Sequence, residues 1–202
     1  MIPLREALAA LRAHRRDDDV VVTTMAAARE WMELGAHPLD LVLVPSSMGQ
    51  ATSFALGIAL AQPRRRVIVC NGDGSMLMNL GSLVSIVAAA PPNLAVIVFD
   101  NGVYEVTGAQ PVPGAGAVDY EMVALGCGFT RTHRYSELAA WEAAIPDVLG
   151  DPGPTFVTLD TLPEPGRPGP RSPGPAAERG RRLHEALRVA RGGAENAERP
   201  NT

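Results

Sequence analysis

Short runs of apolar, often β-branched residues alternate along the chain with longer segments that carry apolar residues at helical spacing. The short runs predict buried strands at residues 20–24, 41–44, 66–70, 94–99 and 155–159, with a further strand beginning near 128–130. The longer segments predict helices at 2–14, 26–34, 46–61, 78–89, 120–125 and 136–149, the last broken or kinked near Pro146.

Strands that are apolar along their whole length and alternate with helices are typical of a parallel sheet covered on both faces. We therefore expect an α/β fold: a single domain with a doubly wound, mainly parallel sheet and helices on both faces. In such folds ligands bind beyond the carboxyl ends of the strands. The loops of interest follow Thr24, Val44, Cys70 and Phe99.

The alternation of strands and helices ends near Leu162. Six of the thirteen residues 163–175 are Pro, a composition that favours extended chain over helix or sheet. We therefore expect the domain to cover residues 1–162. Residues 163–202 should form a Pro-, Gly- and Arg-rich tail in which 176–189 could be helical.

Composition narrows the possible functions. The formal net charge of −4 gives no reason to expect nucleic acid or an anionic membrane as partner. An 18-residue apolar run and a signal-peptide layout are both lacking, so we expect a soluble, cytoplasmic protein. All 18 basic residues are Arg, so neither a Schiff-base lysine nor the lysine of a Walker phosphate loop can come from this chain.

Polar residues follow two successive strands of the expected sheet. Gly72-Asp73-Gly74-Ser75 could be an ordinary turn with Asp73 as helix cap, or a turn where the backbone approaches a phosphate. Asn101 follows the next strand, and neighbouring parallel strands bring their carboxyl ends together, so Asp73 and Asn101 can converge. Carboxylate and amide oxygens suit Mg²⁺, which commonly also binds phosphates. The two motifs together predict a magnesium–diphosphate site.

With these motifs the sequence resembles thiamine diphosphate enzymes, in which G-D-G is followed about one helix and one strand later by Asn. More narrowly, residues 3–162 resemble the C-terminal half of phosphonopyruvate decarboxylase and the β subunit of sulfopyruvate decarboxylase. The stretches that carry the resemblance are 21–24, 47–49, 56–61, 72–75 and 100–105. The resemblance implies the thiamine diphosphate-binding fold, with thiamine diphosphate and Mg²⁺ as cofactors.

The resemblance also implies roles for the residues that would hold the metal and the diphosphate. The side chains of Asp73 and Asn101 and the backbone carbonyl of Val103 would bind Mg²⁺. The amide of Gly74 and the hydroxyl of Ser75 would contact the diphosphate.

Further roles concern the rest of the cofactor. Thr24 would lie near the diphosphate, and Met48 would force the cofactor into its bent form. The carbonyl of Ser46 would accept a hydrogen bond from the aminopyrimidine amine. Tyr104 would contact the cofactor from a segment that is either a lid or plain loop structure. Many members of the family carry Gly near the position of Met25.

Activation of the cofactor in the resembled family requires a Glu that belongs to a separate pyrimidine-binding module. No acidic residue of this chain matches that Glu, so the resemblance implies a partner subunit that supplies it, in an α2β2 or larger assembly. The preferred function is the cofactor-binding subunit of a 2-oxo acid decarboxylase. An acyloin-forming carboligase subunit stays open, as does a non-catalytic nucleotide-binding or regulatory protein, although no G-x-G-x-x-G follows the first strand.

Overall fold

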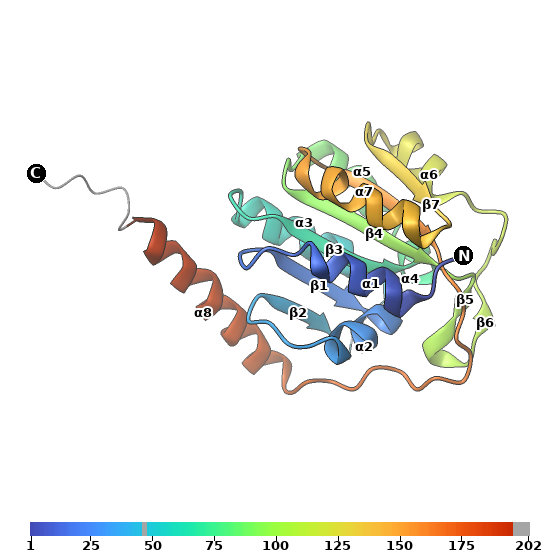
Figure 1. The fold of residues 1–202 in the computed structure, drawn as a ribbon, viewed down its shortest axis with the longest axis horizontal. Helices are drawn as coiled ribbons and strands as arrows, with labels where there is room; N and C mark the ends of the chain where they lie inside the picture. The colour runs from blue at the N-terminus through green and yellow to red at the C-terminus, as the bar shows by residue number, and fades with distance from the viewer. Residues whose placement is uncertain (46–47, 196–202) are drawn as a thin grey trace, which may run out of the picture.

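The computed structural model of the chain describes residues 1–45 and 48–195, with side chains to residue 188. Its centre is a six-stranded sheet in which all neighbouring strands are parallel (Figure 1). The strands are β2 (Asp40–Leu43), β1 (Val20–Thr24), β3 (Val67–Gly72), β4 (Leu94–Asp100), β8 (Thr155–Asp160) and β7 (Thr132–Tyr135), in that spatial order. The expected doubly wound α/β fold is confirmed.

Helices cover both faces of the sheet. One face packs against α1 (Leu4–Ala13), α2 (Met25–Glu33) and α7 (Leu138–Gly150), and the other against α3 (Ala51–Ala61), α5 (Gly81–Ala89) and α6 (Tyr120–Cys127). Alternate residues of each central strand point to opposite faces: Val67 and Val69 join one apolar layer, Ile68 and Cys70 the other. Burial on both faces explains why these strands are apolar throughout.

The segment after β4 forms a small hairpin beside the sheet. It contains β5 (Val103–Tyr104), a 3₁₀ turn (Glu105–Thr107) and β6 (Gln110–Pro111), with β5 and β6 antiparallel. A Gly- and Pro-bearing loop was expected over residues 101–116, and these two short strands were not predicted.

Several expected element bounds were wrong. The helix expected at 46–61 begins at Ala51, and residues 48–50 are not helical. The turn expected at 72–75 is instead the start of a short helix, α4 (Asp73–Leu77), which is separate from α5. Helix α7 continues through Pro146, because Ile145, Val148 and Leu149 on either side of it are buried against the sheet.

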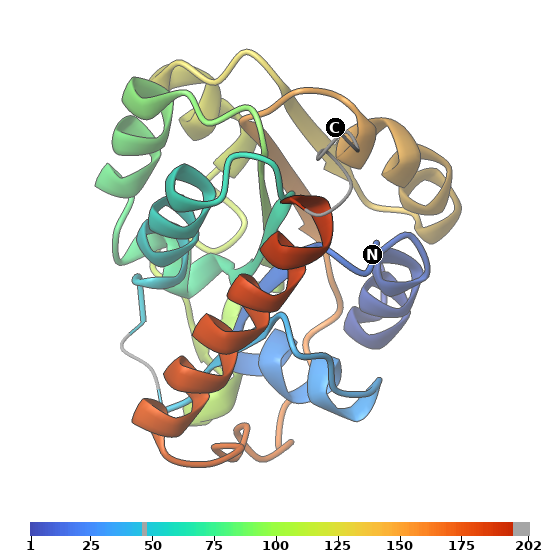
Figure 2. The same cartoon turned by 90° about the vertical axis from the view of Figure 1, so that its left-hand side faces the viewer.

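The tail packs on the domain. Its helix α8 (Ala176–Glu195) is longer than the expected 176–189 and runs past the edge strand β2, as the red helix in Figure 2 shows. Leu183 is buried in the apolar layer on the α3 side. None of the helices in the described ranges combines the length and apolarity needed to cross a bilayer.

Candidate functional site

The two polar motifs meet where β3 and β4 end. The strands pair in parallel up to Gly72 opposite Phe99, so Asp73 and Asn101 leave the sheet side by side. The backbone N–H of Gly102 donates a hydrogen bond of 2.8 Å to Oδ2 of Asp73. The convergence expected from the sequence is therefore present, at the edge of the sheet where ligands bind in such folds.

Asp73 is a buried carboxylate in an acidic neighbourhood. Burial raises its pKa to about 7, and the nearby Asp100 carboxyl adds to the rise. Hydrogen bonds from the backbone amides of Gly74 and Gly102 oppose the rise. A divalent cation between such carboxyl groups would supply the missing positive charge and favour the ionised form.

The amide of Asn101 has a defined orientation. Its Nδ2 donates to Oε2 of Glu105 at 3.0 Å, and its Oδ1 accepts from the backbone N–H of Val103 at 3.1 Å. An ionised carboxylate can only accept hydrogen bonds, so the nitrogen must be the atom that faces Glu105. The amide oxygen therefore points away from Glu105.

A single cavity collects the residues that the sequence singled out. Its lining includes Thr24, Met48, Asp73, Gly74, Ser75, Asn101, Val103 and Tyr104. Ser46, the remaining residue of the expected set, lies outside the described residues. The lining also includes Glu105, which with Tyr104 was expected on a segment that is either a lid or plain loop structure, and Met25, for which no role was predicted.

Close contacts fix the backbone around the cavity. A Cβ at position 74 would lie 2.3 Å from Cε1 of Tyr104, so only Gly lets the ring of Tyr104 pack against this turn. Ser75 Oγ accepts from the backbone N–H of Gly49 at 3.0 Å, which leaves the hydroxyl proton to donate into the site. Tyr120, which the sequence analysis missed, donates from its hydroxyl to the carbonyl of Asp73 at 3.2 Å.

Met25 has an unusual backbone conformation at the cavity wall. Its φ is +52°, in the left-handed region that Gly adopts most readily. Many members of the resembled family have Gly near this position. The β1–α2 junction of this chain therefore keeps a conformation that Gly favours, with a side chain added.

The donor set suits a hard divalent cation. Asp73 offers a carboxylate, Asn101 an amide oxygen and Val103 a backbone carbonyl, all oxygen ligands of the kind Mg²⁺ prefers when phosphates complete its coordination. In the described part of the chain, His, Cys, Asp and Glu do not gather in groups of three or more that could hold a metal. A magnesium–diphosphate site does not require such a group.

Comparison with known proteins decides the family. The family model for the thiamine pyrophosphate enzyme C-terminal TPP binding domain matches residues 19–159. The chain belongs to this family. The fold is thus that of a thiamine pyrophosphate enzyme domain, and Asp73 and Asn101 both lie within the matched residues.

Two relatives illustrate the range of this thiamine pyrophosphate enzyme family. Phosphonopyruvate decarboxylase of Streptomyces viridochromogenes is 41% identical over 73% of this chain, but the match covers only 36% of that protein. Sulfopyruvate decarboxylase subunit beta of Methanothermobacter thermautotrophicus is 36% identical over 73% of this chain and 76% of that subunit. The chain is thus much shorter than the first relative and similar in extent to the second.

A solved structure shares the fold of this thiamine pyrophosphate enzyme domain. It is named as a putative thiamin diphosphate-dependent enzyme from Mycobacterium smegmatis. It superposes with a TM-score of 0.69 at 23% identity and covers 81% of this chain and 32% of that one. At this identity the likeness concerns the fold alone.

Proposed function

We propose that this chain is the cofactor-binding subunit of a thiamine diphosphate-dependent 2-oxo acid decarboxylase. The observation that carries the proposal is the convergence of Asp73 and Asn101 on one cavity, in a domain of the thiamine pyrophosphate enzyme family. Asp73, the oxygen of Asn101 and the carbonyl of Val103 would hold Mg²⁺. The relatives named as decarboxylases supply the reaction class.

Other residues of the cavity would bind the rest of the cofactor. The hydroxyl of Ser75 and the amide of Gly74 would donate to the diphosphate, with Thr24 nearby. Met48 and Tyr104 would pack against the cofactor from two sides of the cavity. Ser46 keeps its predicted role toward the aminopyrimidine. The bound cofactor would supply the electron sink for loss of CO₂ from a 2-oxo acid.

The chain needs a partner for turnover. Of the described residues that line the cavity, Asp73 and Glu105 are the acidic ones. Asp73 belongs to the proposed metal site, and Glu105 forms hydrogen bonds with Arg29 and Asn101. Neither carboxylate is available to activate an aminopyrimidine, so we assign the activating Glu to a pyrimidine-binding subunit, in an α2β2 or larger assembly.

The α3–α5–α6 face is the side of the domain that we assign to this partner. Large apolar side chains are exposed there, namely Phe54, Leu60, Met78, Val84, Met122 and Leu125. Large apolar side chains exposed together on one face are a feature of protein–protein contact surfaces, which supports this assignment. We propose that the pyrimidine-binding subunit covers this face.

Reconstitution tests the proposed function. The chain would be co-purified with a pyrimidine-module protein encoded beside it, and CO₂ release from phosphonopyruvate and sulfopyruvate would be measured with thiamine diphosphate and Mg²⁺. We expect activity from the mixture and none from either chain alone. Robust decarboxylation by this chain without a partner would contradict the proposal. Acyloin formation with an added aldehyde would instead assign a carboligase, and a complex that binds no cofactor would assign a regulatory protein.

The cytoplasmic location stays a prediction from the sequence.

A further inference from the structure

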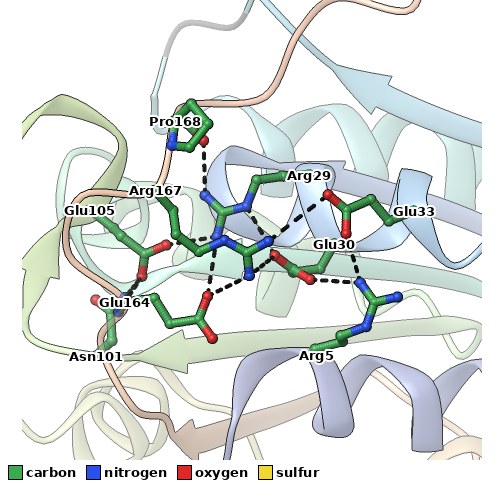
Figure 3. A network of polar contacts seen from close by, with 9 residues as sticks. All are labelled: Arg5, Arg29, Glu30, Glu33, Asn101, Glu105, Glu164, Arg167 and Pro168. Carbon is green, nitrogen blue, oxygen red and sulfur yellow. Dashed lines mark hydrogen bonds and ion pairs between the residues drawn. The ribbon is translucent and has the colours of Figure 1, made fainter.

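A buried ion-pair network lies directly behind the proposed metal ligand Asn101 (Figure 3). Arg29 of α2 donates from Nη2 to Oε1 of Glu105 at 2.9 Å and from Nε to Oε1 of Glu30 at 2.9 Å. The side chains of Arg29 and Glu105 are only 7% and 3% exposed. At this burial an ion pair is held in one geometry and is weakly screened by solvent.

The second oxygen of Glu105 carries the network to the site. Oε2 accepts from Nδ2 of Asn101 at 3.0 Å and from the backbone N–H of Glu164 at 3.2 Å. Glu105 is therefore fixed from two sides: Arg29 holds one oxygen and the tail holds the other. The same oxygen that the tail holds also contacts the amide of Asn101.

The tail segment that supplies this N–H is itself anchored. Arg29 donates from Nη1 to the carbonyl of Pro168 at 3.1 Å. Arg167 lies 3.0 Å from Oε1 of Glu30 and 2.7 Å from Oε2 of Glu164. Residues 164–168 lie after the segment 19–159 that the family model matches, so the match does not cover this anchor.

We propose that Glu105 is a positioning residue for the metal site, held by Arg29 and by residues 164–168 of the tail. The inference rests on the proposed function. The two ends of an Asn amide have nearly the same shape, so packing alone selects the orientation weakly. The carboxylate of Glu105 selects it together with the backbone N–H of Val103, because the flipped amide would place its oxygen against an acceptor and its nitrogen against a donor. Oδ1 of Asn101 is thereby kept facing away from Glu105, on the side of the Val103 N–H, where it would be available to Mg²⁺.

Replacement of Glu105 by Gln tests this role in the full-length chain. The variant Glu105→Gln keeps the size of the side chain, but its own amide can meet Asn101 with either oxygen or nitrogen. Mn²⁺ would be titrated in the presence of thiamine diphosphate and followed by electron paramagnetic resonance. We expect affinity to fall about 10- to 100-fold, the range found when groups that orient metal ligands are replaced. Wild-type affinity in this variant would overturn the inference.

Arg5→Met is the matched control. Arg5 joins the same network through Glu30 at 3.2 Å and Glu33 at 2.7 Å, and contacts neither Glu105 nor Asn101. We expect it to leave Mn²⁺ affinity unchanged. An equal loss of Mn²⁺ affinity in Arg5→Met and Glu105→Gln would mean that both substitutions merely destabilise the network, and would contradict a positioning role. If the wild-type chain binds no Mn²⁺ with thiamine diphosphate, the proposed function fails and this inference with it.

A measurement on the unaltered chain covers the case in which the Glu105 variant does not fold. Nuclear magnetic resonance can follow the side-chain amide protons of Asn101, assigned by their disappearance in Asn101→Asp. We expect one resolved pair that exchanges slowly with solvent, because Nδ2 donates to a buried carboxylate. Exchange as fast as that of a solvated Asn would overturn the inference.

Discussion

Gly102 and Asp73 join the two halves of the proposed metal site, through the 2.8 Å hydrogen bond from the Gly102 amide to Oδ2 of the carboxylate. The bond depends on a left-handed backbone at Gly102, whose φ is +73°. The loop after β4 is therefore fixed against the start of α4 by a conformation that side chains disfavour.

Substitution of Gly102 by Ala should strain this contact. Space is not the obstacle, since the added Cβ would meet Ala115 Cβ at an ordinary 3.6 Å. The obstacle is the left-handed backbone conformation, which Ala adopts at a cost. The substitution should therefore lower the free energy of unfolding by about 1–2 kcal/mol and weaken Mg²⁺ binding. Gly57→Ala is the matched control, because position 57 is helical with open space around it. Urea unfolding should show about 1 kcal/mol of stabilisation for Gly57→Ala; the same sign for both variants would contradict the account.

His37 should make folding sensitive to mild acid. Nδ1 of its ring accepts from Arg15 Nη2 at 2.7 Å and from the Leu39 N–H at 3.2 Å, so protonation at Nδ1 breaks both bonds. Burial first, and then the charge of Arg15, lower the pKa of His37 below its usual 6.5. The unfolded chain therefore takes up the proton first, and stability should fall as pH drops below about 6.5.

Nuclear magnetic resonance titration of the His37 ring measures this directly. We expect the midpoint to lie below 6.5, the ordinary value of the ring. His37→Asn keeps an acceptor near Nδ1 and should flatten the stability profile between pH 7 and 5. A ring that titrates at or above 6.5 would refute the prediction.

The fold could be predicted from sequence because its central strands are buried on both faces, which makes each a continuous apolar run. The edge strand β7 is partly exposed and polar, and it begins at Thr132 rather than near 128–130 as expected. The residues at which the helices begin could not be predicted in the same way. Gly72-Asp73-Gly74-Ser75 has the composition of a turn, but Gly72 ends β3 and the other three residues begin α4. There Gly74 packs against Tyr104, and the carbonyl of Asp73 accepts from Tyr120. Pro146 predicted a break, but burial of α7 against the sheet keeps the helix continuous.

The metal ligands were predictable for the same reason as the strands. Asp73 and Asn101 follow adjacent parallel strands, and register alone brings them together. The ion-pair network around Glu105 could not be predicted from strand register in this way. Glu105 is 76 residues from Arg29 and 59 from Glu164, and these contacts depend on where the tail returns to the domain. One feature of the sequence does indicate the network: Arg29 and Glu30 are adjacent charged residues in a helix segment that is otherwise apolar, and charged residues in such a position need buried partners.

Arg179 should be the main attachment of the tail helix to the sheet. Its guanidinium donates to the carbonyls of Val42 and, at 2.6 Å, Val44 beside the edge strand β2. Arg179→Met should cost about 1.5–3 kcal/mol of α8 docking, the usual contribution of hydrogen bonds to a charged group. Limited proteolysis after residue 175 should accelerate. Arg182→Met, which loses only an exposed ion pair with Glu178, should leave the cleavage rate unchanged; equal rates for both variants would argue against this attachment.

The exposed apolar face makes a separate prediction about assembly. Val84 of α5 is 56% exposed, so Val84→Glu should change the stability of the isolated chain by no more than about 0.5 kcal/mol. In the complex the same charge would be buried without a partner, and association should weaken by at least tenfold. Ala143→Glu, on exposed α7 at the opposite face, is the control. Co-purification of the partner with Val84→Glu at wild-type yield would show that this face is not the interface.

The central claim is that Asp73 anchors a metal-bound diphosphate. Calorimetric titration of the full chain with thiamine diphosphate, with and without Mg²⁺, tests it most directly when repeated on Asp73→Asn. The variant retains an oxygen that can accept from Gly102, so it should fold like the wild type. We predict binding that requires Mg²⁺ in the wild-type chain and is lost in Asp73→Asn. Equal binding by both proteins, or binding by the wild type that is indifferent to Mg²⁺, would contradict the account.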